Sequence, residues 1–240
     1  MQPFSPPEPS SLPRFWRLAS SGTLVQRLLG LTERLLWMRA YLFFEVPVSL
    51  AADRPLPAGV SVTRAEGEEI QRVLKVLPRD YPDGWIEESL RRDACYVLRC
   101  NGEPAAMCWL AREKAQLGAN LYVHLPPSRL LVHSSYVRDR YRGQRLHSLM
   151  RLHSAAAERR SGEDTLVFAA AWRNRNALLS NQRMPAVCTG TVVTLAKAGR
   201  QIQLAGRGLR RRAFRFSRRR ADAEGPLPLA VTGPDSIITT

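Results

Sequence analysis

Residues 129–153 read RLLVHSSYVRDRYRGQRLHSLMRLH, and the rest of the chain is arranged around this stretch. Its first nine residues are rich in branched and aromatic side chains, which favour a β-strand. A basic turn follows, in which Gly143 can adopt a backbone conformation that other residues resist. After the turn, apolar residues recur at helical spacing. The stretch therefore predicts a strand, a turn and a helix that runs to about Arg160.

A turn that ends a strand and opens a helix is suited to bind an anion. The first backbone N–H groups of a helix lack acceptors, and the helix dipole is positive at this end, so phosphate is a frequent ligand. Side-chain charge is added by Arg138, Arg140, Arg142 and Arg145. The alternative is an ordinary crossover connection with solvated arginines.

Residues 136–137 and 142–147 resemble the acyl-CoA signature of the GCN5-related N-acetyltransferase (GNAT) superfamily. In that signature a strand and a basic turn lead into Arg/Gln-x-x-Gly-x-Gly/Ala at the start of a helix. Arg142 matches the first position, whereas Arg145 and His147 stand where small residues are usual. The resemblance implies acetyl-CoA or another acyl-CoA as co-substrate, without a metal. The residues that it implies in cofactor binding are Tyr136, Val137, Arg142, Gly143, Gln144, Arg145, Leu146 and His147.

The order of the expected elements is also that of the GNAT fold. Asn101-Gly102 is a strong signal for a hairpin turn between two strands. We expect strands at 60–64, 95–99, 104–111, 129–137, 165–172 and 187–196, helices at 65–77, 85–92, 146–160 and 174–183, and an irregular connection at 116–127. The resemblance implies an α/β (α+β) fold with a mixed central sheet, flanked by helices, that splays open near its fourth strand, where acyl-CoA enters.

A second family feature is a helix that follows the pattern Asn-x-x-Ala/Ser and carries a tyrosine four residues further on. Asn174 and Ala177 fit this pattern, and the resemblance assigns Asn174 to cofactor binding. Asn181 stands at the position of the tyrosine, which commonly protonates the departing thiolate. The proton donor of this chain would therefore lie elsewhere, or the chain would be catalytically unconventional.

Acyl transfer to an amine requires a held thioester, a polarised carbonyl, a neutral amine and a proton for the sulfur. A backbone N–H near Tyr136 or Val137 can polarise the carbonyl. His133 is the first candidate for proton transfer, because an imidazole titrates near neutral pH, and we expect it to share a face of its strand with Ser135. Glu113 is a candidate base. The alternatives are a structural histidine and a solvated glutamate.

Apolar residues at three- and four-residue steps over 23–44 predict an N-terminal amphipathic helix. It would lie on a membrane surface, form a homodimer or partner interface, or pack on its own domain. We therefore expect a disordered Pro/Ser-rich tail at 1–22, this helix and a linker at 23–57, the GNAT-like domain at 58–200 and a basic, disordered tail at 201–240.

The formal net charge is +15 at pH 7, and arginine supplies most of it. Residues 207–220 interleave eight arginines with Phe214 and Phe216. Such a run can bind nucleic acid, with aromatic rings stacked on bases, or an anionic membrane. The alternative is a solvated tail. Four cysteines without metal-like spacing, no signal peptide and no long apolar run are typical of a cytoplasmic protein, with peripheral membrane association as a variant.

We accordingly expect an acyltransferase that moves an acetyl or other acyl group directly from acyl-CoA to an amine on a small molecule or peptide. One alternative is a degenerate GNAT-fold module that binds or interacts without catalysis. The other is a protein associated with nucleic acid or membrane that acts through its basic tail.

Overall fold

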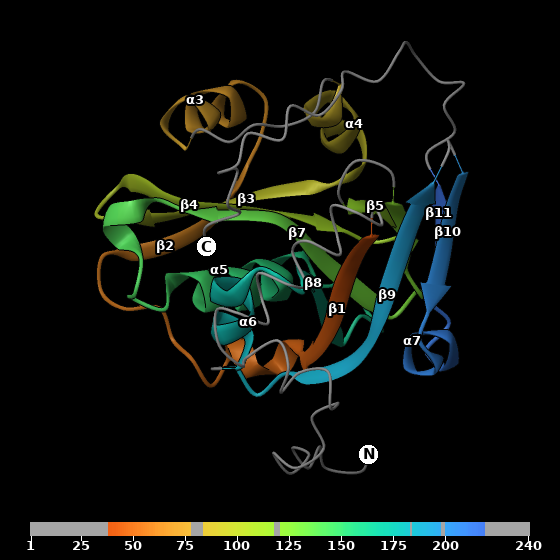
Figure 1. Cartoon of the computed structure of the whole chain (residues 1–240). Coiled ribbons are helices and arrows are strands. Elements are labelled where there is room, and N and C mark those ends of the chain that lie inside the picture. Colours follow the sequence, from red (N-terminus) through yellow and green to blue (C-terminus); the bar gives the residue numbers. More distant parts are fainter. Residues whose placement is uncertain (1–37, 78–83, 118–120, 183, 198–199, 219–240) are drawn as a thin grey trace.

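The computed structural model describes residues 38–77, 84–117, 121–182, 184–197 and 200–218. A mixed eight-stranded sheet lies at its centre, with the strand order β10-β9-β1-β8-β7-β4-β3-β2 (Figure 1). Neighbouring strands are antiparallel except β7 and β8, which are parallel. The strands are β1 (Met38–Pro47), β2 (Val60–Ala65), β3 (Ala94–Cys100), β4 (Glu103–Ala111), β7 (Arg129–Val137), β8 (Thr165–Ala171), β9 (Val187–Lys197) and β10 (Arg200–Ala205).

Helices cover both faces of this sheet. On one face lie α3 (Glu68–Val76) and α4 (Trp85–Arg92), and on the other lie α5 (Leu146–Glu158) and α6 (Arg175–Gln182) (Figure 1). Short 3₁₀ turns occur at η2 (Val48–Ala51) and η3 (Asp139–Tyr141). The larger apolar core fills the space between the sheet and the α5–α6 side, and a smaller core packs under α3 and α4. The expected strands and helices between residues 60 and 197 are thus confirmed, with bounds shifted by a few residues.

The expected amphipathic helix at 23–44 is wrong over its last seven residues. Residues 38–47 form β1, which lies inside the sheet between β8 and β9. Leu42 and Phe44 enter one core, whereas Phe43 enters another on the opposite face. A strand buried on both faces is apolar throughout, so its sequence resembles the broad apolar face of a helix. The sheet therefore begins well before the expected domain start at residue 58, and residues 1–37 lie outside the described residues.

The expected disordered tail at 201–240 is also wrong for its first part. After β10 the chain forms α7 (Arg207–Arg211) and then β11 (Arg215–Arg218), which joins a small antiparallel sheet of order β11-β6-β5. The expected irregular connection supplies its partners, β5 (Lys114–Leu117) and β6 (Leu121–His124). The Phe214 and Phe216 rings pack edge-on against Phe43, with centroids 5.7 and 5.6 Å away. Residues 219–240 lie outside the described residues.

The main sheet opens between β7 and β8, as expected. The two strands pair only from Arg129–Val132 with Thr165–Phe168, although β7 continues to Val137 along β4. We call the place where β7 and β8 stop pairing the fork; it lies beside residues 133–137 of β7. A β-bulge marks the same point: between the pairs Met107–Tyr136 and Trp109–His133, one β4 residue lies opposite two β7 residues, and one of these two, Ser134, has a φ of +49°.

Candidate functional site

A buried polar cluster joins β7, α5 and α6 at the fork. Ser135 comes from β7, and His147 and Arg151 lie four residues apart on α5, so they share one face of that helix. The Ser135 hydroxyl lies 2.7 Å from His147 Nε2 and accepts a longer hydrogen bond of 3.4 Å from Arg151. Arg151 also donates to Asn181 Oδ1 on α6 at 2.7 Å. We call these four residues the Arg151 cluster.

Arg151 is the group on which the electrostatics of this cluster depend. Its side chain is 4% exposed, and its guanidinium lies 4.8 Å from the centre of the Phe168 ring. Within the described part of the chain, no carboxylate forms an ion pair with it. Burial lowers the pKa of Arg151 to about 9, so the side chain is still cationic at neutral pH. The cluster therefore holds a net positive charge beneath the end of the β7–β8 pairing.

His133 lies on the opposite face of β7, where it meets Asp93. The expectation that His133 and Ser135 share a face is wrong, because the bulge inserts an extra residue between them. His133 Nε2 lies 3.1 Å from Asp93 Oδ2, and the imidazole packs edge-on against Trp85 at 5.6 Å. His133 Nδ1 is buried without a hydrogen-bond partner, and so is Nε1 of Trp109, which also packs on Trp85.

The imidazole of His133, held by Asp93, can act as a base. An imidazole whose Nε2–H donates to a carboxylate presents Nδ1 as an acceptor, and the carboxylate stabilises the imidazolium once a proton is taken. Glu113 does not join it. Glu113 is exposed and lies four residues beyond Trp109, the residue that pairs with His133. At strand geometry four residues span about 13 Å, so the structure does not bring the two expected bases together.

The loop before α5 carries much less free charge than its sequence indicates. Arg142 forms an ion pair with Asp139 at 2.7 Å, and Arg140 pairs with Glu103 and stacks 4.8 Å from the centre of the Tyr141 ring. Arg145 is exposed and caps α5 through its backbone, with a φ of +61° and no side-chain cap. The start of α5 therefore has no side-chain cap, and the Ser148 and Leu149 N–H groups bond to the Arg145 carbonyl.

The other expected cofactor residues occupy mixed positions. Val137 and Leu146 are buried in the large core, Tyr136 is half-buried against the smaller one, and Gly143 and Gln144 are exposed in the loop. His147 is 7% exposed and points into the Arg151 cluster, so it is not a residue of the helix surface. The side chain of Asn174 accepts a hydrogen bond from the Ala177 backbone N–H at 2.9 Å and thereby caps α6.

Two functional candidates, Arg151 and Asp93, were not predicted from the sequence. Arg151 interrupts an apolar helix stripe, and a charge on the buried side of an amphipathic helix is a signal that could have found it. Asp93 gives no such signal, because it follows a helix with several charged residues and approaches His133 only in the folded chain. In the sequence Asn181 stands out only because it occupies the tyrosine position of the family pattern. In the structure it accepts a hydrogen bond from Arg151.

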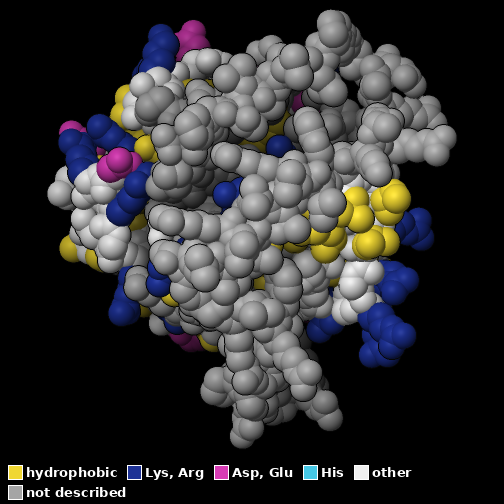
Figure 2. Space-filling view, viewed as in Figure 1, with side chains coloured by type: hydrophobic (Ala, Val, Ile, Leu, Met, Phe, Trp, Pro, Cys, Tyr) yellow, Lys and Arg dark blue, Asp and Glu magenta, His cyan; other side chains and the backbone are white. Residues whose placement is uncertain are grey.

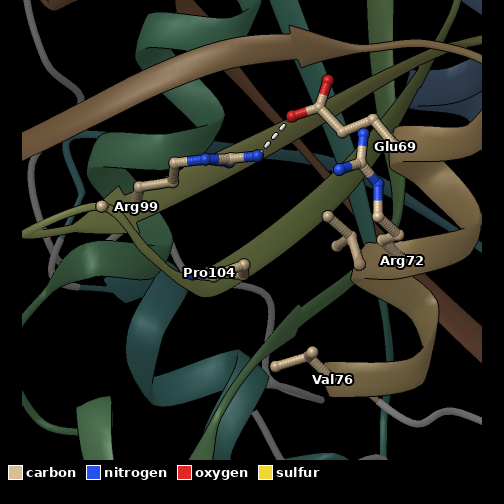
Figure 3. Close-up of a pocket in the computed structure, with 7 residues that line it drawn as sticks. Glu69, Arg72, Val76, Arg99 and Pro104 are labelled. Carbon is tan, nitrogen blue, oxygen red and sulfur yellow. Dashed lines mark hydrogen bonds and ion pairs between the residues drawn. The ribbon is translucent and has the colours of Figure 1, made fainter.

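A separate hollow lies on the α3 side of the sheet, between α3 and the β3–β4 hairpin (Figure 3). Glu69 and Arg99 form an ion pair across it, and Arg72 lies beside them. It belongs to neither the Arg151 cluster nor the His133–Asp93 pair. Among the described residues, no group of three or more His, Cys, Asp or Glu side chains is placed to hold a metal ion.

The basic surface of the C-terminal segment is built from arginines without available aromatics. Arg207, Arg210, Arg211 and Arg215 are exposed, whereas Phe214 is buried against Phe43. Figure 2 shows hydrophobic side chains next to arginines on the side where Figure 1 places β10 and α7. Each helix in the described ranges is too short or too polar to cross a lipid bilayer.

No family model matches the chain, and no curated protein matches it in sequence. Among solved structures, a GCN5-related N-acetyltransferase from Kribbella flavida gives a TM-score of 0.47 at 15% identity, over 68% of this chain and 61% of its own. A functionally unknown conserved protein from Staphylococcus epidermidis gives 0.47 at 10% identity, over 72% and 66%. A GCN5-related N-acetyltransferase from Sphaerobacter thermophilus gives 0.36 at 12% identity, over 80% and 53%.

This chain covers less than two thirds of the length of each of these proteins. At such identities the likeness concerns the fold alone. The order of strands and helices between residues 60 and 197 is the one that the GNAT resemblance in the sequence led us to expect.

Proposed function

We propose that this protein is a GNAT-type acyltransferase that transfers an acyl group from acyl-CoA to an amine. The observation that carries the proposal is the fork. Beyond Val132 the β8-facing edge of β7 has no partner strand among the described residues, and the segment 138–145 connects β7 to the start of α5, which has no side-chain cap. An extended ligand with amide groups can add to a free strand edge, and its phosphates can bind a helix N-terminus. Acyl-CoA combines both features.

The residues around the fork fit such a co-substrate. Backbone groups of 133–137 would hold the amide-bearing arm, and the N–H groups at the start of α5 would hold the pyrophosphate. The exposed Arg145 and the Asp139-paired Arg142 would add charge at the phosphates. Acyl-CoA would supply the thioester for the reaction. The remaining steps, which place the amine and remove its proton, fall to side chains of this chain.

His133 is our candidate for removing the proton of the amine. In this proposal Asp93 holds the imidazole through Nε2, and the unpaired Nδ1 accepts the proton as the amine nitrogen attacks the thioester carbonyl. The C–N bond of the amide forms, the C–S bond of the thioester breaks, and CoA leaves as a thiolate that takes up a proton from solvent. His133 directly precedes the bulged part of β7, so it lies within a few residues of the strand edge that would hold the thioester. Transfer is then direct, without an acyl-enzyme intermediate.

A titration with acetyl-CoA, followed by thermal unfolding, tests the cofactor half of the proposal. A ligand that binds only the native state raises the melting temperature with concentration. We expect a clear rise in the wild-type protein and none in an Arg142→Glu, Gly143→Asp double variant. Arg159→Glu is the matched control, because Arg159 is exposed at the far end of α5. No rise at millimolar acetyl-CoA would contradict the proposal.

A free-thiol assay over amines, aminoglycosides, polyamines and peptides tests the transfer half. A second candidate function is a binding module without catalysis. It is favoured by the side chains of His147 and Arg151, which lie on the α5 side of the fork. Acetyl-CoA binding without thiol release over the whole panel would favour that second candidate.

A further inference from the structure

We propose that the fork binds a carboxylate on Arg151, so that either the acyl group or the amine acceptor of this protein carries an acidic group. This inference rests on the proposed acyltransferase function and names the class of its substrate.

The first argument is the missing counter-ion. Arg151 is almost fully buried, and its partners are neutral: the Asn181 amide, the Ser135 hydroxyl and the face of the Phe168 ring. Buried charges in proteins are normally paired, because desolvation of a lone ion is unfavourable. No other described residue supplies that pair. A ligand that brought a negative charge to this place would supply it.

The second argument is a pair of unused donors. Within the cluster, Arg151 Nε and Asn181 Nδ2 are buried without a hydrogen-bond acceptor. The amide orientation of Asn181 is fixed, because its Oδ1 accepts from Arg151 Nη1 at 2.7 Å. Buried N–H groups without acceptors are rare in folded proteins. A carboxylate presents two acceptor oxygens in one plane, which suits the edge of a guanidinium and a neighbouring amide.

The third argument is the position of the guanidinium. Arg151 contacts Phe168, the last β8 residue that pairs with β7, and Ser135, which lies beyond that pairing. The cation thus marks the point where the strands stop pairing, at the place where the proposed thioester would end. The phosphates of the co-substrate have a separate binding place at the start of α5, five residues earlier in the chain. A carboxylate near the reacting end is therefore the anion that fits.

The carboxylate can come from two sources. It can belong to a dicarboxylic acyl group, such as malonyl or succinyl, or to an amino acid that serves as acceptor. Calorimetric titration of the full chain separates them. One arm compares malonyl- and succinyl-CoA with propionyl- and butyryl-CoA, which have the same chain lengths without the charge. The other arm adds amino acids, or the corresponding simple amines, to protein saturated with acetyl-CoA.

In one of the two arms we expect the acidic ligand to bind roughly tenfold or more tightly than its neutral match, as for a charge-assisted hydrogen-bonded pair. Arg151→Met should abolish that preference while affinity for neutral thioesters stays the same. Arg159→Met, at an exposed arginine of the same helix, should leave the preference intact. A wild-type protein that shows no preference in either arm would overturn the inference, even if acetyl-CoA binds well.

The stability of the unliganded variant separates a binding role from a structural one. Arg151→Met removes the desolvation penalty of an unpaired cation but also the donor to Asn181 Oδ1, so the two effects should offset each other and the melting temperature should change little. A strong destabilisation by Arg151→Met would contradict a binding role. If that variant does not fold, the wild-type comparison of acidic and neutral ligands still decides. Absence of binding by every thioester would instead overturn the proposed function itself, together with the acyl arm.

Discussion

At the scale of single residues, Ser134 determines which side chains β7 presents on each face. In a regular strand successive side chains alternate, so His133 and Ser135 would lie on one side. The positive φ of Ser134 and the bulge opposite Cys108 break this alternation. One irregular residue thereby separates the His133–Asp93 pair, under α4, from the Arg151 cluster, under α5. The two groups reach the same stretch of β7 from opposite faces.

A first prediction concerns His133. His133→Ala should lower the turnover rate by roughly 10²–10⁴-fold, which is the usual contribution of a positioned general base. Affinity for acetyl-CoA should not change, because the imidazole lies on the α4 side of β7, away from the start of α5. Turnover from a free-thiol assay and affinity from calorimetry check the two parts separately.

Asp93→Asn is the companion variant for this prediction. It keeps the shape of the side chain but removes the charge that would stabilise an imidazolium, so turnover should fall while the melting temperature changes little. A His133→Ala protein with wild-type turnover would exclude His133 as the base. An unfolded His133→Ala protein would shift the test to Asp93→Asn, for which unchanged turnover would contradict the assignment.

At the scale of elements, the C-terminal end of α5 is held by a network of ion pairs. Arg112, just beyond β4, donates to Glu158 at 2.7 Å and to Glu163 at 2.9 Å. The Tyr96 hydroxyl on β3 donates to Glu158 at 2.9 Å. Burial would raise the pKa of the Glu158 carboxyl, but the hydrogen bonds and charges of Arg112, Tyr96 and Arg64 outweigh it and lower that pKa.

A second prediction follows for the stability of the protein in acid. Because the pKa of Glu158 is lower in the folded chain than in the unfolded one, its contribution is complete above the unfolded pKa, near 4.5. It is lost as the pH falls through the lower folded value. Denaturant unfolding between pH 3 and 7 should show this loss, and Glu158→Gln should be less stable than wild type at pH 7 but nearly equal to it at pH 3.

Glu87→Gln is a suitable control, because Glu87 is exposed on α4. It should leave the pH profile of the unfolding free energy almost unchanged. A constant difference between Glu158→Gln and wild type across the whole pH range would show that the loss is one of packing and not of charge.

A third prediction tests whether the segment at 207–218 is part of the fold. Phe214 is 4% exposed and packs on Phe43 of β1, which lies in the middle of the main sheet. Phe214→Ala should therefore lower the free energy of unfolding by ~3–5 kcal/mol, as for other large aromatic side chains in cores. Urea denaturation measures it. A change below about 0.5 kcal/mol, typical of exposed positions, would mean that this segment is not packed on the sheet.

The elements differ in how well their sequences predicted them. The strand at 129–137 has one face in each core, and the hairpin at Asn101-Gly102 has a strong turn signal. Both predictions are confirmed. The first strand failed as a prediction because a centrally buried strand has no alternation that distinguishes it from a helix. The basic segment at 207–218 was predicted wrongly because arginines dominate it, and the partner of its Phe214 and Phe216 rings lies about 170 residues away on β1.

The candidate site was predictable only in part, for a related reason. The phosphate-binding turn is local, so its residues adjoin in the sequence and the motif locates it. Arg151 and Asn181 come from different helices, and Asp93 ends α4 whereas His133 lies on β7, 40 residues later. Pairs of this kind form only through tertiary packing, so local sequence patterns do not predict them. The bulge at Ser134 then placed His133 on the face opposite to the expected one.

At the scale of the whole molecule, the net charge of +15 is distributed unevenly between neutralised and free arginines. In the loop before α5, Arg140 and Arg142 face carboxylates, and Arg129 and Arg212 share Glu45. The arginines of α7 at 207, 210 and 211 are exposed. Next to them on the edge strand β10, Ile202 and Leu204 are 58% and 56% exposed. Alternate residues of a strand share a face, so these two form one apolar surface.

We therefore predict that this surface binds anionic membranes in preference to nucleic acid. Arginines attract an anionic lipid headgroup layer, and exposed apolar side chains can enter its boundary, whereas nucleic acid would prefer aromatic rings that here are packed on Phe43. Co-sedimentation with vesicles of phosphatidylserine and phosphatidylcholine should pull down the protein, and vesicles of phosphatidylcholine alone should not. An Arg207→Ala, Arg210→Ala, Arg211→Ala variant should lose most of the binding.

Two comparisons distinguish binding by the specific surface at β10 and α7 from a general electrostatic attraction of a basic protein to anionic lipid. A variant with the same charge loss at exposed arginines elsewhere, Arg91→Ala, Arg159→Ala, Arg160→Ala, should keep most of the binding, since none of these arginines lies next to Ile202 and Leu204 in the chain. An Ile202→Ser, Leu204→Ser variant should weaken binding even at high salt, because its effect is not screened. Equal losses in the two arginine variants, or no effect of the serine changes, would attribute the attraction to net charge and contradict a specific surface at β10 and α7.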